Sequence, residues 1–181
     1  MPSADMHSLV TPAFDIRPLS SSAALVPMLS RLLIDVVAHG GSVGFMHPLP
    51  PEQAQAFWRN SLAAADRGAR IVLGAFDEGS LMGTVTLLLD CPPNQPHRGE
   101  IAKLMTHRDY RGRGVASSLL HAAQTLAREH RRTLLVLDTA SDEGASALYE
   151  KLGYVRAGEI PDYALKPHGG LTGTIIFWKK V

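Results

Sequence analysis

The chain has 181 residues, 45% of them hydrophobic and 19% charged, which is enough to bury the core of a folded domain. Its formal net charge of +1 gives no reason to expect binding to nucleic acid or to an anionic membrane. A single cysteine, Cys91, excludes an internal disulfide framework and fits a reducing cytoplasm. No signal peptide or membrane helix is recognisable, and the eight histidines lack the paired spacing of metal ligands, so we expect no metal.

The first half of the chain predicts a strand, two helices and a hairpin. Residues 1–11 are polar, and we expect them to form a disordered tail. Apolar residues at helical spacing indicate the two helices, and glycine follows each of them. Asp77-Glu78-Gly79-Ser80 is typical of a hairpin turn. The predicted elements are a strand over 14–17, helices over 20–38 and 50–67, and strands over 71–76 and 81–89.

The second half alternates strands and helices. Residues 133–138 form a nearly unbroken apolar run, as expected for a buried central strand. The other predicted elements are a loop over 91–98, a strand over 100–105, helices over 115–130 and 141–151, and strands over 154–160 and 174–178 separated by a loop over 161–173. Because no internal repeat or low-complexity linker interrupts this order, we expect residues 1–181 to form a single domain.

The loop before the predicted helix 115–130 has the features of a phosphate-binding site. A helix N-terminus carries unpaired N–H groups and a partial positive charge, both of which favour an anion. Gly112 and Gly114 let the backbone approach a ligand closely, and Arg108, Arg111 and Arg113 add positive charge. The sequence therefore predicts a phosphate cradle, with a solvated basic loop as the alternative for the arginines.

Three known phosphate-binding patterns are candidates for this loop. Gly112 and Gly114 match the start of a dinucleotide fingerprint, but the third glycine is missing and the remaining chain is too short for the second half of that fold. A Walker loop is excluded because no Gly-Lys-Ser/Thr occurs. The third pattern is Arg-x-x-Gly-x-Ala, which is present at Arg111, Gly114 and Ala116 and resembles the pyrophosphate signature of the GNAT (GCN5-related) N-acetyltransferases.

The resemblance to the GNAT family extends over nearly the whole chain. The run Leu148-Tyr149-Glu150-Lys151-Leu152-Gly153-Tyr154 is similar to the signature of the family's last helix, and the order of the predicted elements matches the family's fold. The resemblance implies an α/β fold with a central mixed, mostly antiparallel sheet of about seven strands. Its fourth and fifth strands would be splayed apart, and about four helices would flank it. The implied activity is acetyl-CoA-dependent N-acetylation.

Some shorter segments resemble one branch of the family, the tabtoxin-resistance acetyltransferase. These segments are residues 39–46, 103–105, 137–139 and 158–163. The branch suggests that the acceptor is a small amino-acid-like toxin or antibiotic. Two alternatives stay open, namely a protein or peptide N-acetyltransferase and a non-catalytic CoA-binding module.

The resemblance also implies which residues hold the cofactor. Pantetheine would lie between the splayed fourth and fifth strands, with backbone groups of Leu104, Met105 and Thr106 as its partners. The pyrophosphate would bind main-chain N–H groups of the cradle, which consists of Arg111, Gly112, Arg113, Gly114, Val115 and Ala116. Backbone donors and arginine side chains suit phosphates on physical grounds as well.

The chemistry requires a base and an acid. An alkyl ammonium has a pKa of about 10 and must lose a proton before it attacks a thioester, so a carboxylate is the natural base. The resemblance implies that Glu100 and Asp138 are these carboxylates and that Tyr149 is the general acid for the thiolate. We expect Glu100 to lie closer to the amine and Asp138 to assist it. The alternatives are an ion pair of Glu100 with Arg98 or Lys103, a helix-capping role for Asp138, and simple burial for Tyr149.

The identity of the acceptor is the feature that the sequence determines least. Several acidic side chains could form a mouth that attracts a cationic or zwitterionic amine: Glu100, Asp138, Asp142, Glu143, Glu159 and Asp162. We therefore expect a small-molecule amine as the partner, with no nucleic acid and no membrane, and a homodimer is compatible with the sequence.

Overall fold

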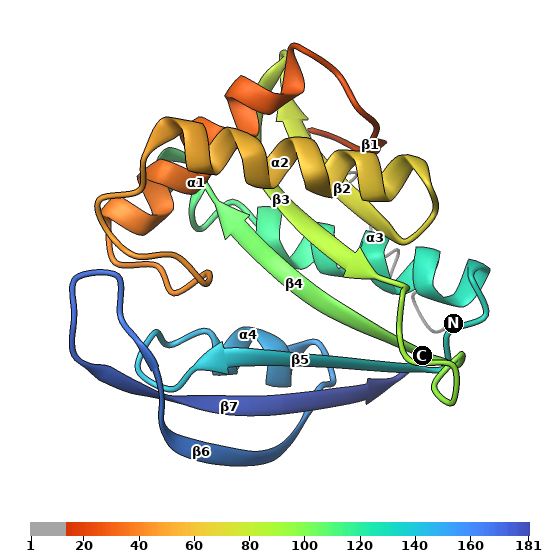
Figure 1. Cartoon of the computed structure of the whole chain (residues 1–181). Coiled ribbons are helices and arrows are strands. Elements are labelled where there is room, and N and C mark those ends of the chain that lie inside the picture. The colour runs from red at the N-terminus through yellow and green to blue at the C-terminus, as the bar shows by residue number, and fades with distance from the viewer. Residues whose placement is uncertain (1–13) are drawn as a thin grey trace, which may run out of the picture.

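The structure is a computed structural model that describes residues 14–181, so the predicted disordered tail over 1–11 lies outside the described residues. The described chain forms a seven-stranded sheet with the order β1-β2-β3-β4-β5-β7-β6 (Figure 1). The strands are β1 (Asp15–Leu19), β2 (Arg70–Asp77), β3 (Ser80–Leu88), β4 (Arg98–Thr106), β5 (Leu134–Ala140), β6 (Val155–Leu165) and β7 (Leu171–Lys180). The helices are α1 (Leu25–Ala38), α2 (Pro51–Asp66), α3 (Val115–Glu129) and α4 (Ser146–Lys151), with a 3-10 turn, η1 (Arg108–Tyr110).

The sheet opens between its fourth and fifth strands. All neighbouring strands are antiparallel except β4 and β5, which are parallel. Their pairing is confined to Arg98–Glu100 of β4 and Leu134–Val136 of β5, after which the two strands diverge (Figure 1). The predicted mixed, mostly antiparallel sheet with splayed central strands is therefore confirmed.

Two hydrophobic clusters cover the two faces of the sheet. One cluster joins α1 and α2 to the sheet around Leu29, Leu33 and Trp58. The other joins α3 to the opposite face around Leu119 and Phe177, and it includes Tyr149 of α4. The helices thus form an outer layer on each side, which is why their apolar residues recur at helical spacing.

Three predicted boundaries differ from the structure. The first helix begins at Leu25 rather than near residue 20, since the Ser22 hydroxyl accepts a hydrogen bond from Ala24 N in a turn before it. The helix predicted over 141–151 begins only at Ser146. The loop predicted over 161–173 is wrong, because β6 and β7 extend through most of it. A register shift between Ile160 and Ala164 absorbs the residues that suggested a break, so strand pairing resumes beyond them.

Candidate active site

The predicted phosphate cradle is an open helix N-terminus. Gly114 is the N-cap of α3 in the left-handed region, with φ 79°, and it supplies no side-chain cap. The first turn of α3 carries no acidic residue. Cβ atoms added at Gly112 and Gly114 would meet no other atom within 4 Å. The amides of the first turn are therefore free for an anion, and space is left next to both glycines for a ligand to approach.

A pocket of about 260 Å³ forms at this cradle. It is lined by most of the predicted cofactor residues, namely Thr106, Arg111, Gly112, Gly114, Val115 and Ala116. Arg113 does not line this pocket. Its guanidinium lies 3.4 Å from Asp77 Oδ2 and 5.2 Å from the ring centroid of Tyr110. Arg111 is exposed and forms no ion pair within residues 14–181, so it is the cradle arginine best placed to contact a phosphate.

A second cavity, of about 280 Å³, fills the wedge where β4 and β5 diverge. Ile101 to Leu104 of β4 line one wall, Asp138 and Thr139 of β5 the other, and Tyr149 of α4 also contributes. We call this cavity the slot. Thr106 of β4 lines the cradle pocket while Leu104 lines the slot, so the two cavities follow the same strand. A cofactor with a phosphate end and a long neutral arm fits this arrangement, and the predicted pantetheine site at Leu104 to Thr106 lies along it.

The two candidate carboxylates occupy different positions. Asp138 is exposed, lines the slot, and accepts a hydrogen bond from Thr174 Oγ1 at 3.2 Å. Glu100 is the last β4 residue paired with β5, its Oε2 lies 3.1 Å from Arg98 Nη1, and it does not line the slot. The alternative partner predicted for Glu100 is therefore present. The predicted capping role of Asp138 is wrong, because Ala145 is the N-cap of α4.

Tyr149 is both a core residue and a slot residue. It is buried, and its ring centroid lies 5.6 Å from that of Phe177 and 5.9 Å from that of Tyr154. Burial raises the pKa of the Tyr149 hydroxyl above its ordinary value, and the nearby Tyr154, Asp138 and Glu143 raise the pKa further. The hydroxyl therefore holds its proton at neutral pH, which is the state required of an acid.

A third cavity adjoins the slot on the side away from the cradle. It measures about 360 Å³, and it shares Ser42, Gly44, Asp138 and Thr139 with the slot. Its other lining residues come from Phe45 and Met46 in the α1–α2 loop and from the β6–β7 hairpin, including Tyr163 and Leu165. We call it the acceptor-side pocket, since a molecule in it would meet the slot at Asp138.

The α1–α2 loop and the β6–β7 hairpin are joined across this pocket. His47 N donates to Pro167 O at 2.9 Å, and His168 Nε2 lies 2.9 Å from Ala38 O. Ser42 N also donates to Glu143 Oε1 at 2.6 Å. The first two contacts join the α1–α2 segment to the β6–β7 hairpin, and the third joins the α1–α2 loop to the segment before α4. The sequence did not reveal these contacts between segments far apart in the chain.

The slot also contains one residue that sequence reasoning missed. Lys103 lies on β4 with φ 51°, an unusual conformation for a residue other than glycine, and its side chain lines the slot. Burial lowers the pKa of the Lys103 ammonium, the negative field of Asp138 opposes this effect, Arg70 lowers the pKa, and Glu100 raises it. A lysine in a strand gives no sequence signal for either the backbone geometry or the burial.

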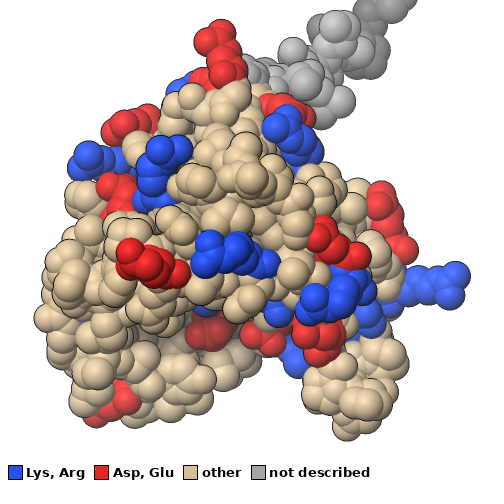
Figure 2. All heavy atoms as spheres, turned by 45° about the horizontal axis from the view of Figure 1, so that its top comes forward, with Lys and Arg blue, Asp and Glu red and all other residues tan. Residues whose placement is uncertain are grey.

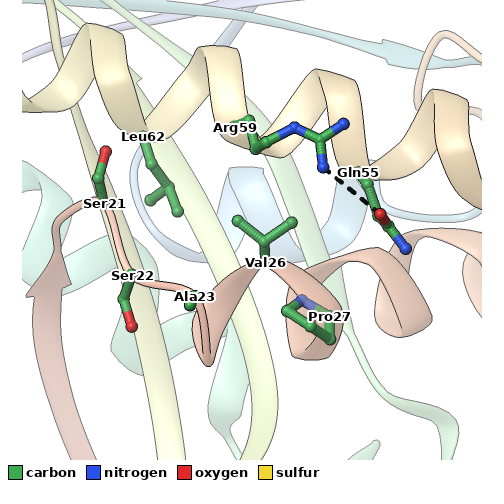
Figure 3. A pocket seen from close by; sticks show the side chains of 8 residues that line it. All are labelled: Ser21, Ser22, Ala23, Val26, Pro27, Gln55, Arg59 and Leu62. Carbon is green, nitrogen blue, oxygen red and sulfur yellow. Dashed lines mark hydrogen bonds between the residues drawn. The ribbon is translucent and has the colours of Figure 1, made fainter.

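Neither the largest cavity nor the surface charge indicates an active site in another part of the molecule. A cavity of about 670 Å³ lies between the start of α1 and α2, lined by small and apolar side chains with Gln55 and Arg59 (Figure 3). Arg59 donates to Gln55 at 3.4 Å, and no acidic side chain lines the cavity, so it lacks a base. On the described part of the surface seen in Figure 2, basic and acidic side chains are interspersed. No helix within residues 14–181 is long and apolar enough to cross a membrane.

The fold and these cavities together form a site whose shape and chemistry suit an acyl-CoA. A glycine-rich cradle at a helix N-terminus leads along β4 into a wedge between parallel strands, where a carboxylate and a protonated tyrosine meet. The profile of the acetyltransferase (GNAT) family matches residues 40–154, more than half of the chain, and the chain belongs to that family. That family is described as one of acetyltransferases, and the related structure yncA was solved with its cofactor acetyl-CoA.

Relatives of known name are similar over part or most of the chain. N-alpha-acetyltransferase MAK3 of Arabidopsis thaliana is 37% identical over 92 residues, which cover 50% of this chain and 48% of that protein. The match therefore spans about half the length of that relative. N-acetyltransferase 8 of Rattus norvegicus is 27% identical over 175 residues, covering 88% of this chain and 77% of that protein.

Solved structures confirm the fold. A ribosomal-protein-alanine N-acetyltransferase from Brucella melitensis superposes with a TM-score of 0.76 at 22% identity, covering 92% of this chain and 99% of that one. The acetyltransferase yncA from Salmonella typhimurium, solved with acetyl-CoA, has a TM-score of 0.76 at 18% identity, covering 93% of this chain and 94% of that one. At these identities the likeness shows the fold alone.

Proposed function

We propose that this enzyme acetylates the amine of a small molecule by direct transfer from acetyl-CoA. The observation that carries the proposal is the position of Asp138, which lines both the slot and the acceptor-side pocket. An amine in the pocket would thus meet a carboxylate at the entrance to the slot. Acetyl-CoA supplies the activated acetyl thioester, and the chain's own residues bind it, orient the amine and move protons.

Asp138 is the base in this proposal. Its carboxylate takes a proton from the acceptor ammonium, directly or through a water, so that the neutral nitrogen can attack. The Thr174 hydroxyl, which lies 3.2 Å from both the Asp138 carboxylate and Thr139 O, can donate its proton to the carboxylate. Glu100 is retained as the second proposed carboxylate, acting from the strand junction where Arg98 holds it. Tyr149 keeps a proton at the wall of the slot, where the departing sulfur needs one.

Two features support a small acceptor. The acceptor-side pocket has a volume of about 360 Å³, within the usual range for small-molecule sites. The two segments that line it, the α1–α2 loop and the β6–β7 hairpin, are linked by the hydrogen bond from His47 N to Pro167 O. An amino-acid-like compound, including a toxin or antibiotic as in the tabtoxin-resistance branch, would fit such a site. We also propose that the enzyme is a single domain. We place it in the cytoplasm, in accord with the free thiol of Cys91.

A second candidate is acetylation of a polypeptide N-terminus. It is favoured by the relatives from Arabidopsis thaliana and Schizosaccharomyces pombe, both named N-alpha-acetyltransferases. In this case the β6–β7 hairpin would have to move away from the α1–α2 loop to admit a chain.

A CoA-release assay on the purified protein tests the two candidates together. Amino acids, small amines and short peptides with free N-termini would be compared at matched concentrations, with Asp138→Asn as the control for enzymatic turnover. We expect turnover with one or more small amines and its loss in the variant. Turnover with peptides alone would refute the small-molecule proposal and support the second candidate.

A further inference from the structure

Within residues 14–181, Lys103 is held on the wall of the slot without an acidic partner for its charge. Its Nζ lies 5.9 Å from the ring centroid of Phe45 and 5.7 Å from that of Phe57. These rings support the ammonium from the side of the α1–α2 loop and of α2. None of the ion pairs or side-chain hydrogen bonds formed within residues 14–181 includes Lys103.

The charges that face Lys103 leave its ammonium poorly compensated. Glu100 is engaged by Arg98 at 3.1 Å, and Arg70 adds a second positive field. Asp138 and Glu143 line the same cavity, but neither forms an ion pair with Lys103, and Glu143 accepts a hydrogen bond from Ser42 N. A half-buried cation in this position gains free energy from any anion that enters the slot, because its own solvation is incomplete.

Acetyl-CoA does not provide that anion. Its thioester and pantetheine arm are neutral, and its phosphates belong at the cradle around Gly114, beyond Thr106 at the far end of β4. An acidic group on the acceptor can therefore supply an ion-pair partner for Lys103. In the proposed function Asp138 receives the ammonium that is to be acetylated, so one acceptor molecule would carry both charges.

We infer that Lys103 binds an acidic group of the acceptor, and that the acceptor is a zwitterion with a carboxylate close to its amine. A free α-amino acid or a close analogue has this pattern, with the ammonium at Asp138 and the carboxylate at Lys103. A polypeptide N-terminus does not, because a neutral amide follows its ammonium. The inference rests on the proposed small-molecule function and names the substrate class of that same site.

The experiment compares matched pairs of acceptors on the purified full-length enzyme. Each free α-amino acid is paired with its α-amide, and kcat and KM are measured for both by CoA release at saturating acetyl-CoA. For the wild type we expect kcat/KM to be at least about 10-fold higher for the acid, the worth of one charged hydrogen bond. Lys103→Met keeps the apolar stem and should lower the acid-to-amide ratio of kcat/KM about 10- to 100-fold, chiefly through KM.

Two further variants control for charge and folding. Lys103→Arg keeps a cation and should retain most of the preference for the acid, whereas Lys151→Met removes an exposed lysine at the end of α4 and should leave the ratio unchanged. Thermal unfolding checks that each variant is folded. The wild-type comparison of acid and amide requires no substitution, so it tests the inference even if Lys103→Met is unstable.

Each contrary outcome has a defined meaning. Equal kcat/KM for acids and amides in the wild type would overturn the inference while leaving small-molecule acetylation intact. Another contrary outcome is that Lys103→Met lowers kcat/KM for the acid and the amide by the same factor, or shifts the pH–rate profiles of both in the same way. Either result would mean that Lys103 only supports the fold or balances the charge of Asp138, and it would refute the inference. If the wild type acetylates peptides but no small amine, the proposed function fails and the inference fails with it.

Discussion

Replacing Gly114 with alanine separates the strain of its backbone from its role in binding acetyl-CoA. The residue has φ 79°, and an added Cβ would meet no atom within 4 Å. A left-handed conformation costs an L-residue about 1 to 2 kcal/mol, and the stiffer unfolded chain offsets about 0.4 to 1 kcal/mol of this cost. The free energy of unfolding should thus fall by about 1 kcal/mol, which lowers Tm by about 2 to 4 °C in a chain of this size.

Gly68 provides a matched control for this variant. It follows α2, has φ 76°, and an added Cβ there also meets nothing within 4 Å. Gly68→Ala should therefore lose the same stability as Gly114→Ala. Only Gly114→Ala should weaken acetyl-CoA binding, by about 10-fold or more, because a methyl group beside the free amides disturbs at least one charged hydrogen bond.

Calorimetric titration with acetyl-CoA and thermal unfolding of both variants give the two readouts. Gly114→Glu adds negative charge to the cradle and should abolish measurable binding in a folded protein. Equal acetyl-CoA affinity in the Gly114→Ala and Gly68→Ala variants would refute the assignment of the cradle to the pyrophosphate.

Four predictions concern the reacting groups and the contact between Ser42 and Glu143. Asp138→Asn should lower kcat by about 10²- to 10⁴-fold with little change in acetyl-CoA affinity. It should also remove the acid limb of the pH–rate profile, and an unchanged acid limb would contradict a base at Asp138. Glu100→Gln should lower kcat less than Asp138→Asn, and the reverse order would make Glu100 the base. Tyr149→Phe should lower kcat without altering the profile near neutral pH, because burial raises the hydroxyl's pKa and it stays protonated there. Glu143→Gln weakens the contact with Ser42 N, a residue that lines both cavities, and should raise KM for the acceptor; a raised KM for acetyl-CoA alone would place this contact on the cofactor's side.

Local patterns were sufficient to predict most of the fold. The helices α1 and α3 each bury one face against the sheet, so periodicity placed α3 correctly and α1 correctly except for its start. The Asp77–Ser80 turn also occurs where its composition indicated. The extent of β6 was missed, because Pro161 and Asp162 indicate a break and only the long-range pairing with β7 shows that the strand continues.

The phosphate end of the site was more predictable than the acceptor end. A glycine-rich loop before a helix carries its chemistry in consecutive residues, and Gly112 to Ala116 indeed border one pocket, apart from Arg113. The acceptor end is assembled from residues distant in sequence, such as Ser42, Asp138 and Tyr163, so no local spacing reveals it. The roles of Glu100, Asp138 and Tyr149 stay predictions until the variants are measured.

The geometry of β4 links the opening of the slot to the position of Lys103. Between the pairs Thr84–Met105 and Thr86–Ala102, the two residues Lys103 and Leu104 stand opposite one residue of β3. This is a β-bulge, which bends a strand and increases its twist, and it lies just beyond the point where β4 leaves β5. The bulge keeps β4 attached to β3 while its outer half turns away from β5, and it places Lys103 on the wall that this turn exposes.

A left-handed lysine costs the fold about 1 to 2 kcal/mol. Glycine would avoid this cost, so a lysine in this conformation is more readily explained by what its side chain binds in the slot than by the demands of the sheet.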